Sequence, residues 1–190
     1  MRYSEDHKAQ THQRIIDEAS ERFRRDGVGA TGLQPLMKAL GLTHGGFYAH
    51  FKSKDDLVEQ ALRAAAAKLS EVSTEVFAGD NPLPRFIEGY LSAAHRANPG
   101  QGCPLPTLSS ELGQRGQASS TTDEVVRERL AMIESALPGP DASEQSIAML
   151  STLVGALMLS RSVADPALSD RILETVRSQL IRQTNGKQPN

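Results

Sequence analysis

Apolar residues recur every three or four positions along most of this 190-residue chain, and this spacing most limits its fold. In the first such segment, Ile16, Ala19 and Phe23 lie on one face of a helix predicted over residues 7–26, which Gly27 closes. The alternating β-branched runs that are typical of strands are missing. We therefore predict an all-α protein of about nine helices.

The same spacing predicts further helices along the chain. Two short ones follow Gly27, and the others cover residues 54–77, 83–97, 107–113, 122–137, 143–164 and 167–183. The small, polar segment 113–122 is predicted to be a mobile loop, and the tail 185–190 to be disordered. We predict three parts: an N-terminal helical part over residues 1–54, a second helical part over 55–184, and the tail.

The charge of the chain differs between its two predicted domains. The whole chain has 21 Lys and Arg against 23 Asp and Glu, a net charge of -2 that by itself argues against a generally basic nucleic-acid binder. Residues 1–54, however, hold 9 basic and 6 acidic residues, and the rest of the chain holds 12 and 17. A mildly basic N-terminal part and an acidic body remain compatible with a nucleic-acid partner at the N-terminal part.

Cysteine and apolar content indicate the compartment. The single cysteine, Cys103, cannot form an intrachain disulfide, so nothing requires an oxidising environment. The N-terminal residues lack the apolar core of a signal peptide, and no uninterrupted apolar run approaches the ~18 residues that a membrane span needs. We expect a cytoplasmic protein without a membrane partner.

Residues 27–57 contain three closely spaced helix-start signals. Thr31 with Gln34 has the spacing of a capping box, Gly41 followed by Thr43 predicts a tight turn and a second cap, and Ser53 with Asp56 has the spacing of a third. Two short helices joined by a tight turn that contains glycine form a helix-turn-helix motif, whose second helix enters the major groove of DNA.

The composition of the second helix, over residues 44–51, suits contact with DNA. The two glycines Gly45 and Gly46 let the backbone approach phosphates or base edges closely. Phe47 and Phe51, four residues apart, are expected to face the core. The remaining polar side chains are expected to face the nucleic acid; they are Tyr48, His50, Lys52 and Lys54.

Residues 43–57 (THGGFYAHFKSKDDL), together with the helix before Gly27 and the predicted cap Thr31, resemble the DNA-binding fingerprint of the TetR family of bacterial transcription regulators. The resemblance covers residues 10–60, and Pro35 departs from the polar residue of that pattern. It implies that residues 1–54 form a helix-turn-helix DNA-binding domain and that residues 55–184 form a helical sensory and dimerisation domain. It also implies a homodimer that binds a palindromic operator in double-stranded DNA and dimerises through the last two helices. The expected DNA contacts are Thr31, Gln34, Thr43, His44, Gly45, Gly46, Tyr48, His50, Lys52 and Lys54.

The resemblance implies a ligand-responsive transcriptional regulator, interpreted as a repressor that an inducer releases from DNA. One interpretation places an apolar or amphipathic ligand among the helices of residues 57–137, lined by Phe86, Tyr90, His95 and Met132, which core packing explains equally well. The other interpretation assigns sensing to Cys103. The stretch from residue 90 to Pro104 resembles a TetR subgroup with a Gly-Cys pair, some of whose members resemble electrophile or redox sensors, although a lone cysteine is also a common buried residue.

Enzymatic signatures are not found in the sequence. The five histidines lack the spacing of metal ligands, and no nucleotide-binding glycine loop or Ser-His-Asp order is present, so we expect neither a metal site nor a cofactor. The alternative to a regulator is a helical enzyme or a protein-interaction module that has the motif without operator binding.

Overall fold

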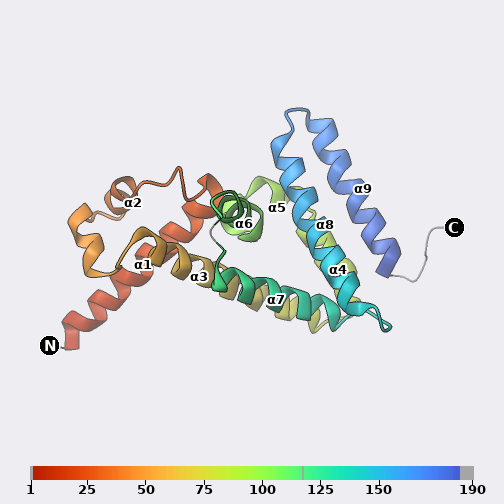
Figure 1. The fold of residues 1–190 in the computed structure, drawn as a ribbon, viewed down its shortest axis with the longest axis horizontal. Coiled ribbons are helices and arrows are strands. Elements are labelled where there is room, and N and C mark those ends of the chain that lie inside the picture. Colours follow the sequence, from red (N-terminus) through yellow and green to blue (C-terminus); the bar gives the residue numbers. More distant parts are fainter. Residues whose placement is uncertain (1, 117, 185–190) are drawn as a thin grey trace. The chain divides into compact units, whose positions relative to one another are not determined.

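The computed structural model describes residues 2–116 and 118–184, and within them it contains nine α-helices, two 3-10 helices and no strand (Figure 1). The predicted all-α class is therefore confirmed. The elements, in chain order, are α1 (Arg2–Asp26), α2 (Leu33–Ala39), η1 (His44–Ala49), α3 (Lys54–Phe77), α4 (Pro82–Tyr90), α5 (Ala93–Ala97), η2 (Pro99–Gln101), α6 (Leu105–Gln114), α7 (Ser120–Glu134), α8 (Ala142–Ser162) and α9 (Pro166–Thr184).

The chain forms two compact units that are not continuous in sequence. Unit 1 contains residues up to Lys68 together with 99–121, and unit 2 contains 69–98 together with the chain from Thr122 onwards. The segment that holds η2 and α6 therefore packs with the N-terminal helices, although more than 80 residues separate Gly102 from the middle of α1. The functional boundary that we predict at residue 54 stays a prediction.

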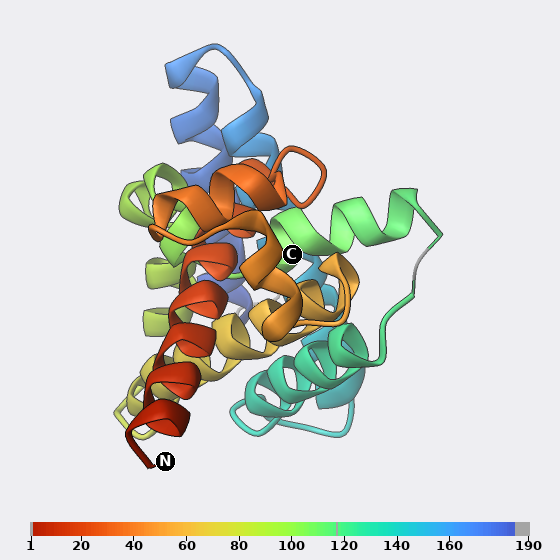
Figure 2. The same ribbon diagram turned by 90° about the vertical axis from the view of Figure 1, so that its left-hand side faces the viewer.

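Unit 1 is built around the apolar face of α1. Ile15, Ala19 and Phe23 are fully buried there, as the helical spacing predicts. η2 and α6 both pack on α1, and Figures 1 and 2 show α6 beside the C-terminal end of that helix. At this end, Arg24 donates from Nη1 to the carbonyl of Gly102 at 3.0 Å, which ties the segment before α6 to α1.

Most helix boundaries differ from those predicted by one to three residues, and two differ more. α1 begins at Arg2 instead of residue 7. The helix predicted over residues 83–97 is two helices, α4 and α5, because the backbone leaves the helical conformation at Leu91 and Ser92. The Ser92 hydroxyl then accepts from the backbone N–H of His95 at 3.0 Å and begins α5. The apolar spacing continues across this break, which explains why it predicts one helix.

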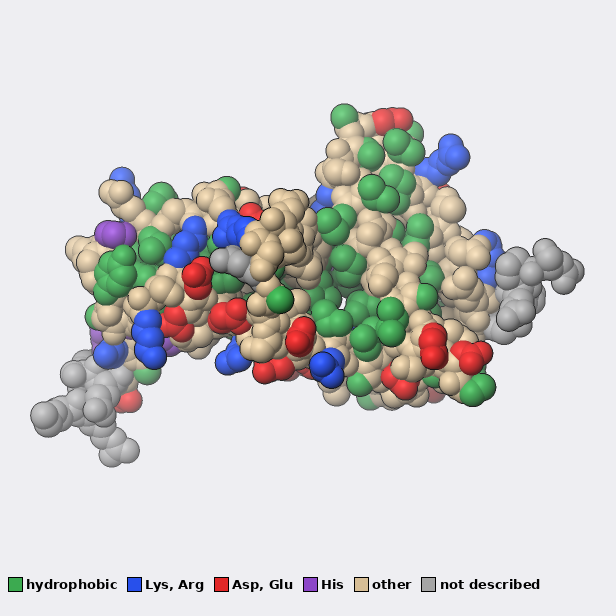
Figure 3. Space-filling model, viewed as in Figure 1, with side chains coloured by type: hydrophobic (Ala, Val, Ile, Leu, Met, Phe, Trp, Pro, Cys, Tyr) green, Lys and Arg blue, Asp and Glu red, His purple; other side chains and the backbone are tan. Residues whose placement is uncertain are grey.

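Unit 2 is dominated by α8 and α9, which run antiparallel side by side (Figure 1). α4 packs against both helices. One side of this pair remains uncovered: Ile147, Leu159 and Leu168 are exposed, and Figure 3 shows hydrophobic side chains gathered over it. By length and composition α8 could cross a membrane, yet a third of its most apolar window (33%) is buried within the protein. The predicted disordered tail 185–190 lies outside the described residues.

Candidate nucleic-acid interface

The predicted second helix of the motif is the 3-10 helix η1, which ends at Ala49 instead of residue 51. Thr43 begins it, and its Oγ1 accepts from the backbone N–H of Gly46 at 3.2 Å, so the predicted cap is confirmed. Gly41, with a φ of 73°, makes the turn from α2 that a side chain would strain. The helix-turn-helix geometry therefore follows from local residues at both ends of the turn.

The inner side of η1 is anchored by stacked rings. Phe47 is fully buried and Phe51 is 2% exposed, as predicted, and their ring centroids lie 5.3 Å apart. His12 of α1 stacks on Phe51 at 4.5 Å and shares a hydrogen bond of 3.0 Å with Gln60 of α3. This stack connects α1, the motif and α3, so the outer face of η1 is held by a rigid base.

The outer face of η1 carries the exposed members of the predicted site. Tyr48 is 62% exposed, and the ring of His44 meets it edge-on at 6.0 Å. A Cβ at Gly45 would meet no atom within 4 Å, so the backbone there is open to a ligand. The members of the predicted site with exposed side chains are Gln34, Thr43, His44, Tyr48 and Lys52.

His50 differs from these residues because it is half buried. Its Nδ1 is buried without a hydrogen-bond partner among the described residues. Burial, and then the positive charges of His12 and Lys8, lower the pKa of His50 below its usual value. This shift favours the neutral form of the imidazole, and with it a hydrogen-bonding role over that of a cation.

The start of α3 has the predicted third cap. The hydroxyl of Ser53 accepts from the backbone N–H of Asp56 at 3.1 Å. The carboxylate of Asp56 in turn accepts from the backbone N–H of Lys52 at 2.9 Å and from the amide of Gln60 at 2.8 Å. These bonds stabilise the ionised carboxylate and lower the pKa of Asp56. They fix the direction in which the chain leaves η1.

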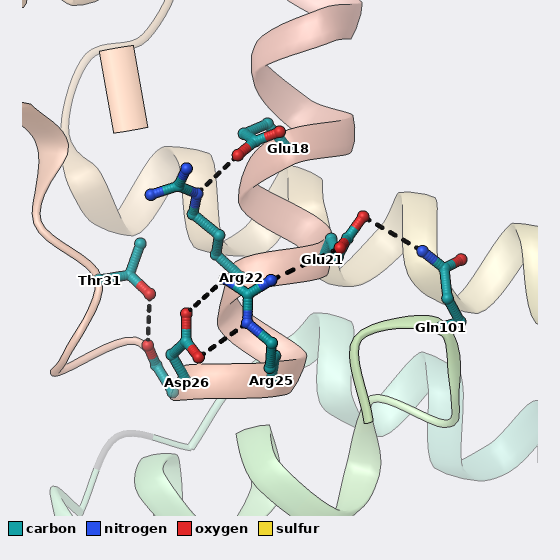
Figure 4. Close-up of polar contacts among 8 residues, drawn as sticks. Glu18, Glu21, Arg22, Arg25, Asp26, Thr31 and Gln101 are labelled. Atoms are coloured by element: carbon teal, nitrogen blue, oxygen red, sulfur yellow. Dashed lines mark hydrogen bonds and ion pairs between the residues drawn. The ribbon is translucent and has the colours of Figure 1, made fainter. Parts of the chain in front are cut away.

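Thr31 does not cap α2, which corrects the predicted capping box. The hydroxyl of Thr31 donates to the carbonyl of Gly27 at 2.7 Å, and Gly32 stands at the N-cap without a side-chain bond. Thr31 is 5% exposed, and Figure 4 shows it turned towards the end of α1. The reason is local: the turn after α1 brings the Gly27 carbonyl closer to this hydroxyl than the first amides of α2.

The ammonium of Lys54 is also turned inwards. Its Nζ donates to the carbonyls of Val28 and Thr31, both at 2.6 Å. Burial, and then the charge of Arg115, lower the pKa of Lys54, while Glu111 and Asp55 oppose the shift. A role for Lys54 in phosphate contact stays a prediction, beside a clear structural role in holding the turn before α2.

One contact to this turn has no signal in the sequence. The carboxylate of Glu111, on α6, accepts from the backbone N–H of Val28 at 2.6 Å and of Gly29 at 3.2 Å. Nothing in the spacing of residues 105–114 marks Glu111, because its partners lie 82 and 83 residues earlier in the chain.

The residues predicted to sense a ligand fall into two sets. In unit 2, Phe86, Tyr90 and His95 form a continuous run of ring contacts, with centroids 5.8 and 4.9 Å apart. Burial lowers the pKa of His95, although the hydrogen bond to the Tyr90 carbonyl opposes this shift. Met132, on α7, has its sulfur 3.8 Å from Nη1 of Arg129. Cys103, in unit 1, is buried.

The N-terminal residues match a known family. Residues 15–61 match the model of the bacterial regulatory proteins of the tetR family. Residues 15–61 are therefore the helix-turn-helix segment of the TetR family. The match includes η1 with its cap Thr43 and the cap of α3 at Ser53, so the geometry described above is that of the family's defining segment.

Proteins similar to this chain are known by sequence and by structure. It is 36% identical over 74 residues to the HTH-type transcriptional regulator AcrR of Shigella flexneri, covering 37% of this chain and 34% of that protein. It is 27% identical over 122 residues to the HTH-type transcriptional repressor DhaR of a Mycobacterium species, covering 64% of this chain and 58% of that protein. The matched part of this chain thus spans about a third of the length of AcrR and just over half of the length of DhaR.

The structural similarity extends beyond the motif to almost the whole chain. The structure of NemR of E. coli in its reduced form superposes with a TM-score of 0.74 at 18% identity, covering 90% of this chain and 95% of that one. At this identity the likeness concerns the fold.

Proposed function

We propose that this protein is a transcriptional repressor that binds a palindromic operator in double-stranded DNA as a homodimer and leaves it when an inducer acts. The observation that carries the proposal is the two-sided character of η1: Phe47 and Phe51 are buried below it, while Tyr48 and His44 project from it. Exposed polar side chains on a rigidly held short helix are what base and phosphate contacts require. We expect no enzymatic activity.

The exposed side of α8 and α9 supports the homodimer. Leu159 is 58% exposed and Ile147 is 52% exposed, which is costly for apolar side chains in water. A groove of about 700 Å³ between α8 and α9 is lined by Leu137, Ala148 and Met149 among others. A second copy that packs α8 and α9 against this side forms a four-helix bundle and buries these side chains. Such a dimer also explains the apolar character of α8 in a cytoplasmic protein.

Salt dependence of DNA binding tests the central proposal. A duplex is selected from a randomised pool by the protein itself, and its affinity is measured by fluorescence anisotropy between about 50 and 200 mM salt. Contact with several phosphates predicts that the affinity falls by roughly a thousandfold over this range. A flat response, or no duplex retained from the pool, refutes the regulator and favours the helical enzyme or protein-interaction module.

Two kinds of inducer remain in the proposal. The first is a small molecule with an apolar or aromatic body, which would bind against the contacting rings of Phe86, Tyr90 and His95. The edges and faces of these rings can pack against a further aromatic ring. The test is a thermal-shift screen of aromatic compounds, in which Phe86→Ala abolishes the shift of a binding compound.

The second inducer is a thiol reagent that acts at Cys103. Arg24 supports it. Burial lowers the pKa of Arg24, and the negative charges of Glu21 and then of the Cys103 sulfur oppose this shift, so the guanidinium favours the thiolate in return. Burial of Cys103 acts in the opposite direction, since it disfavours the thiolate and restricts access. Cys103→Ser is expected to keep DNA binding and to lose its response to quinones or peroxide; a retained response excludes Cys103 as the sensor.

A further inference from the structure

The turn between α1 and α2 is held by a carboxylate from a distant helix. Gly27 has a φ of 88°, and the chain then turns so that the N–H groups of Val28 and Gly29 both donate to Glu111. A Cβ at Gly27 would lie 2.7 Å from Oε1 of Glu111, so the glycine is what lets the carboxylate come this close. Two backbone N–H groups on one carboxylate form a charge-assisted pair of hydrogen bonds.

The carbonyl groups of the same turn are held from α3. Lys54 donates to the carbonyls of Val28 and Thr31, so Val28 is bound through its N–H by α6 and through its C=O by α3. Arg115, one turn after Glu111 on the chain, lies close to Gly29: a Cβ placed there would be 3.1 Å from its Nη2. The turn is thus bound from both sides: the carboxylate of Glu111 accepts from its N–H groups, and the ammonium of Lys54 donates to its carbonyls.

α6 is in turn fixed to the end of α1 before it reaches Glu111. The hydroxyl of Thr107 donates to the carbonyl of Arg24 at 2.9 Å, and the Arg24 guanidinium holds the carbonyl of Gly102, next to Cys103. α6 therefore begins at Leu105, two residues after Cys103, and contacts the turn that precedes α2 through Glu111. α2 begins at Leu33 and packs on η1, so a displacement of the turn displaces the exposed face of η1.

We propose that Glu111 is a positioning residue for DNA binding: by holding the N–H groups of Val28 and Gly29, it sets the orientation of α2 and η1 and transmits the position of α6 to them. This inference rests on the proposed function, since it assumes that η1 binds DNA. Glu111 itself does not face the nucleic acid; it acts through the backbone of the turn.

Glu111→Gln tests this role in the full chain, with Glu75→Gln as its control. Glutamine has the size of glutamate but no charge, and its amide can accept with one oxygen only, so one turn N–H loses its acceptor. Glu75 is exposed on α3, so its variant makes the same change of charge away from the turn. Amide hydrogen exchange of Val28 and Gly29 is expected to become about tenfold faster in Glu111→Gln and to stay unchanged in the control.

DNA affinity separates positioning from mere stabilisation of the fold. At 25 °C, well below the unfolding transition, a structural role leaves affinity unchanged, because nearly all molecules remain folded. A positioning role predicts about tenfold weaker binding of Glu111→Gln to the duplex that the wild type selects from a random pool, at an unchanged salt slope. Equal affinities of the two variants and the wild type overturn the positioning role alone. Failure of the wild type to retain any duplex overturns the proposed function itself.

Discussion

Replacing Lys54 by methionine distinguishes two roles for its ammonium group. The sequence pattern predicts contact with a DNA phosphate, whereas the structure directs Nζ to the carbonyls of Val28 and Thr31, both at 2.6 Å. Methionine keeps most of the apolar length of the side chain and removes the charge and the hydrogen-bond donors. The variant therefore tests what the ammonium binds in solution.

The expected loss of stability follows from these two bonds. A hydrogen bond to a charged group contributes about 1.5–3 kcal/mol, and here two of them share one ammonium. Burial lowers the pKa of Lys54, which means that the ammonium also loses hydration, and methionine recovers that cost. The net loss is about 2 kcal/mol, which lowers the Tm of a chain of this size by about 4–8 °C.

The assay compares Lys54→Met with Lys52→Met in stability and in DNA binding. Lys52 is exposed two residues earlier, and the one hydrogen bond it makes in the structure is through its backbone N–H. Lys52→Met is expected to leave Tm almost unchanged and to reduce the salt slope of DNA binding by about 0.9, the value for one lost phosphate contact. Lys54→Met is expected to lower Tm and to keep the slope of the wild type.

The opposite pattern would refute this reasoning. If Lys54→Met loses about 0.9 of the salt slope while its Tm stays within about 1 °C of the wild type, then the ammonium binds phosphate and the two carbonyls do not hold it in solution.

Three further predictions concern the dimer, the core and the effect of pH. Leu159→Glu places a charge on the uncovered side of α8 and is expected to give monomers with unchanged helical circular dichroism; sedimentation at the dimer mass contradicts it. Phe47→Ala should reduce the free energy of unfolding by about 3–5 kcal/mol in guanidinium titrations, because the ring is fully buried; a loss below about 1 kcal/mol is inconsistent with that burial. Burial and the charges of His12 and Lys8 hold the pKa of His50 below about 6.5, so the folded state binds this proton less readily than the unfolded state. Its contribution to stability is complete above about pH 6.5 and is lost as the pH falls through the folded-state pKa, so His50→Asn should lose less stability than the wild type between about pH 7.5 and 5.5.

Features with local causes were predicted from the sequence. The caps at Thr43 and Ser53 use backbone N–H groups three residues further on, so their spacing is visible in the chain itself. The same applies to Phe47 and Phe51, whose separation of four residues places both on one side. The capping box predicted at Thr31 was wrong for a reason that is also local. The Thr31 hydroxyl donates to the Gly27 carbonyl, four residues earlier, instead of accepting from an N–H group of α2.

Features that depend on distant segments were not predicted. The bond between Glu111 and Val28 joins residues 83 apart, and no periodicity in either segment points to the other. The inward turn of Lys54 has the same origin, because its two acceptors lie 23 and 26 residues earlier in the chain. The break between α4 and α5 was missed for another reason: the apolar face is continuous across Leu91, which is fully buried, while the backbone is not.

The hydrogen bonds between Glu111 of α6 and the turn between α1 and α2 have a consequence for protein engineering. A chimera that joins residues 1–54 to the ligand-responsive part of another regulator leaves Glu111 behind, so the amides of Val28 and Gly29 lose their acceptor. Thr107 would be missing as well, and with it a partner of the last carbonyls of α1. The compact unit that contains the helix-turn-helix motif is discontinuous in sequence, and an exchange at residue 54 would remove its second segment, residues 99–121.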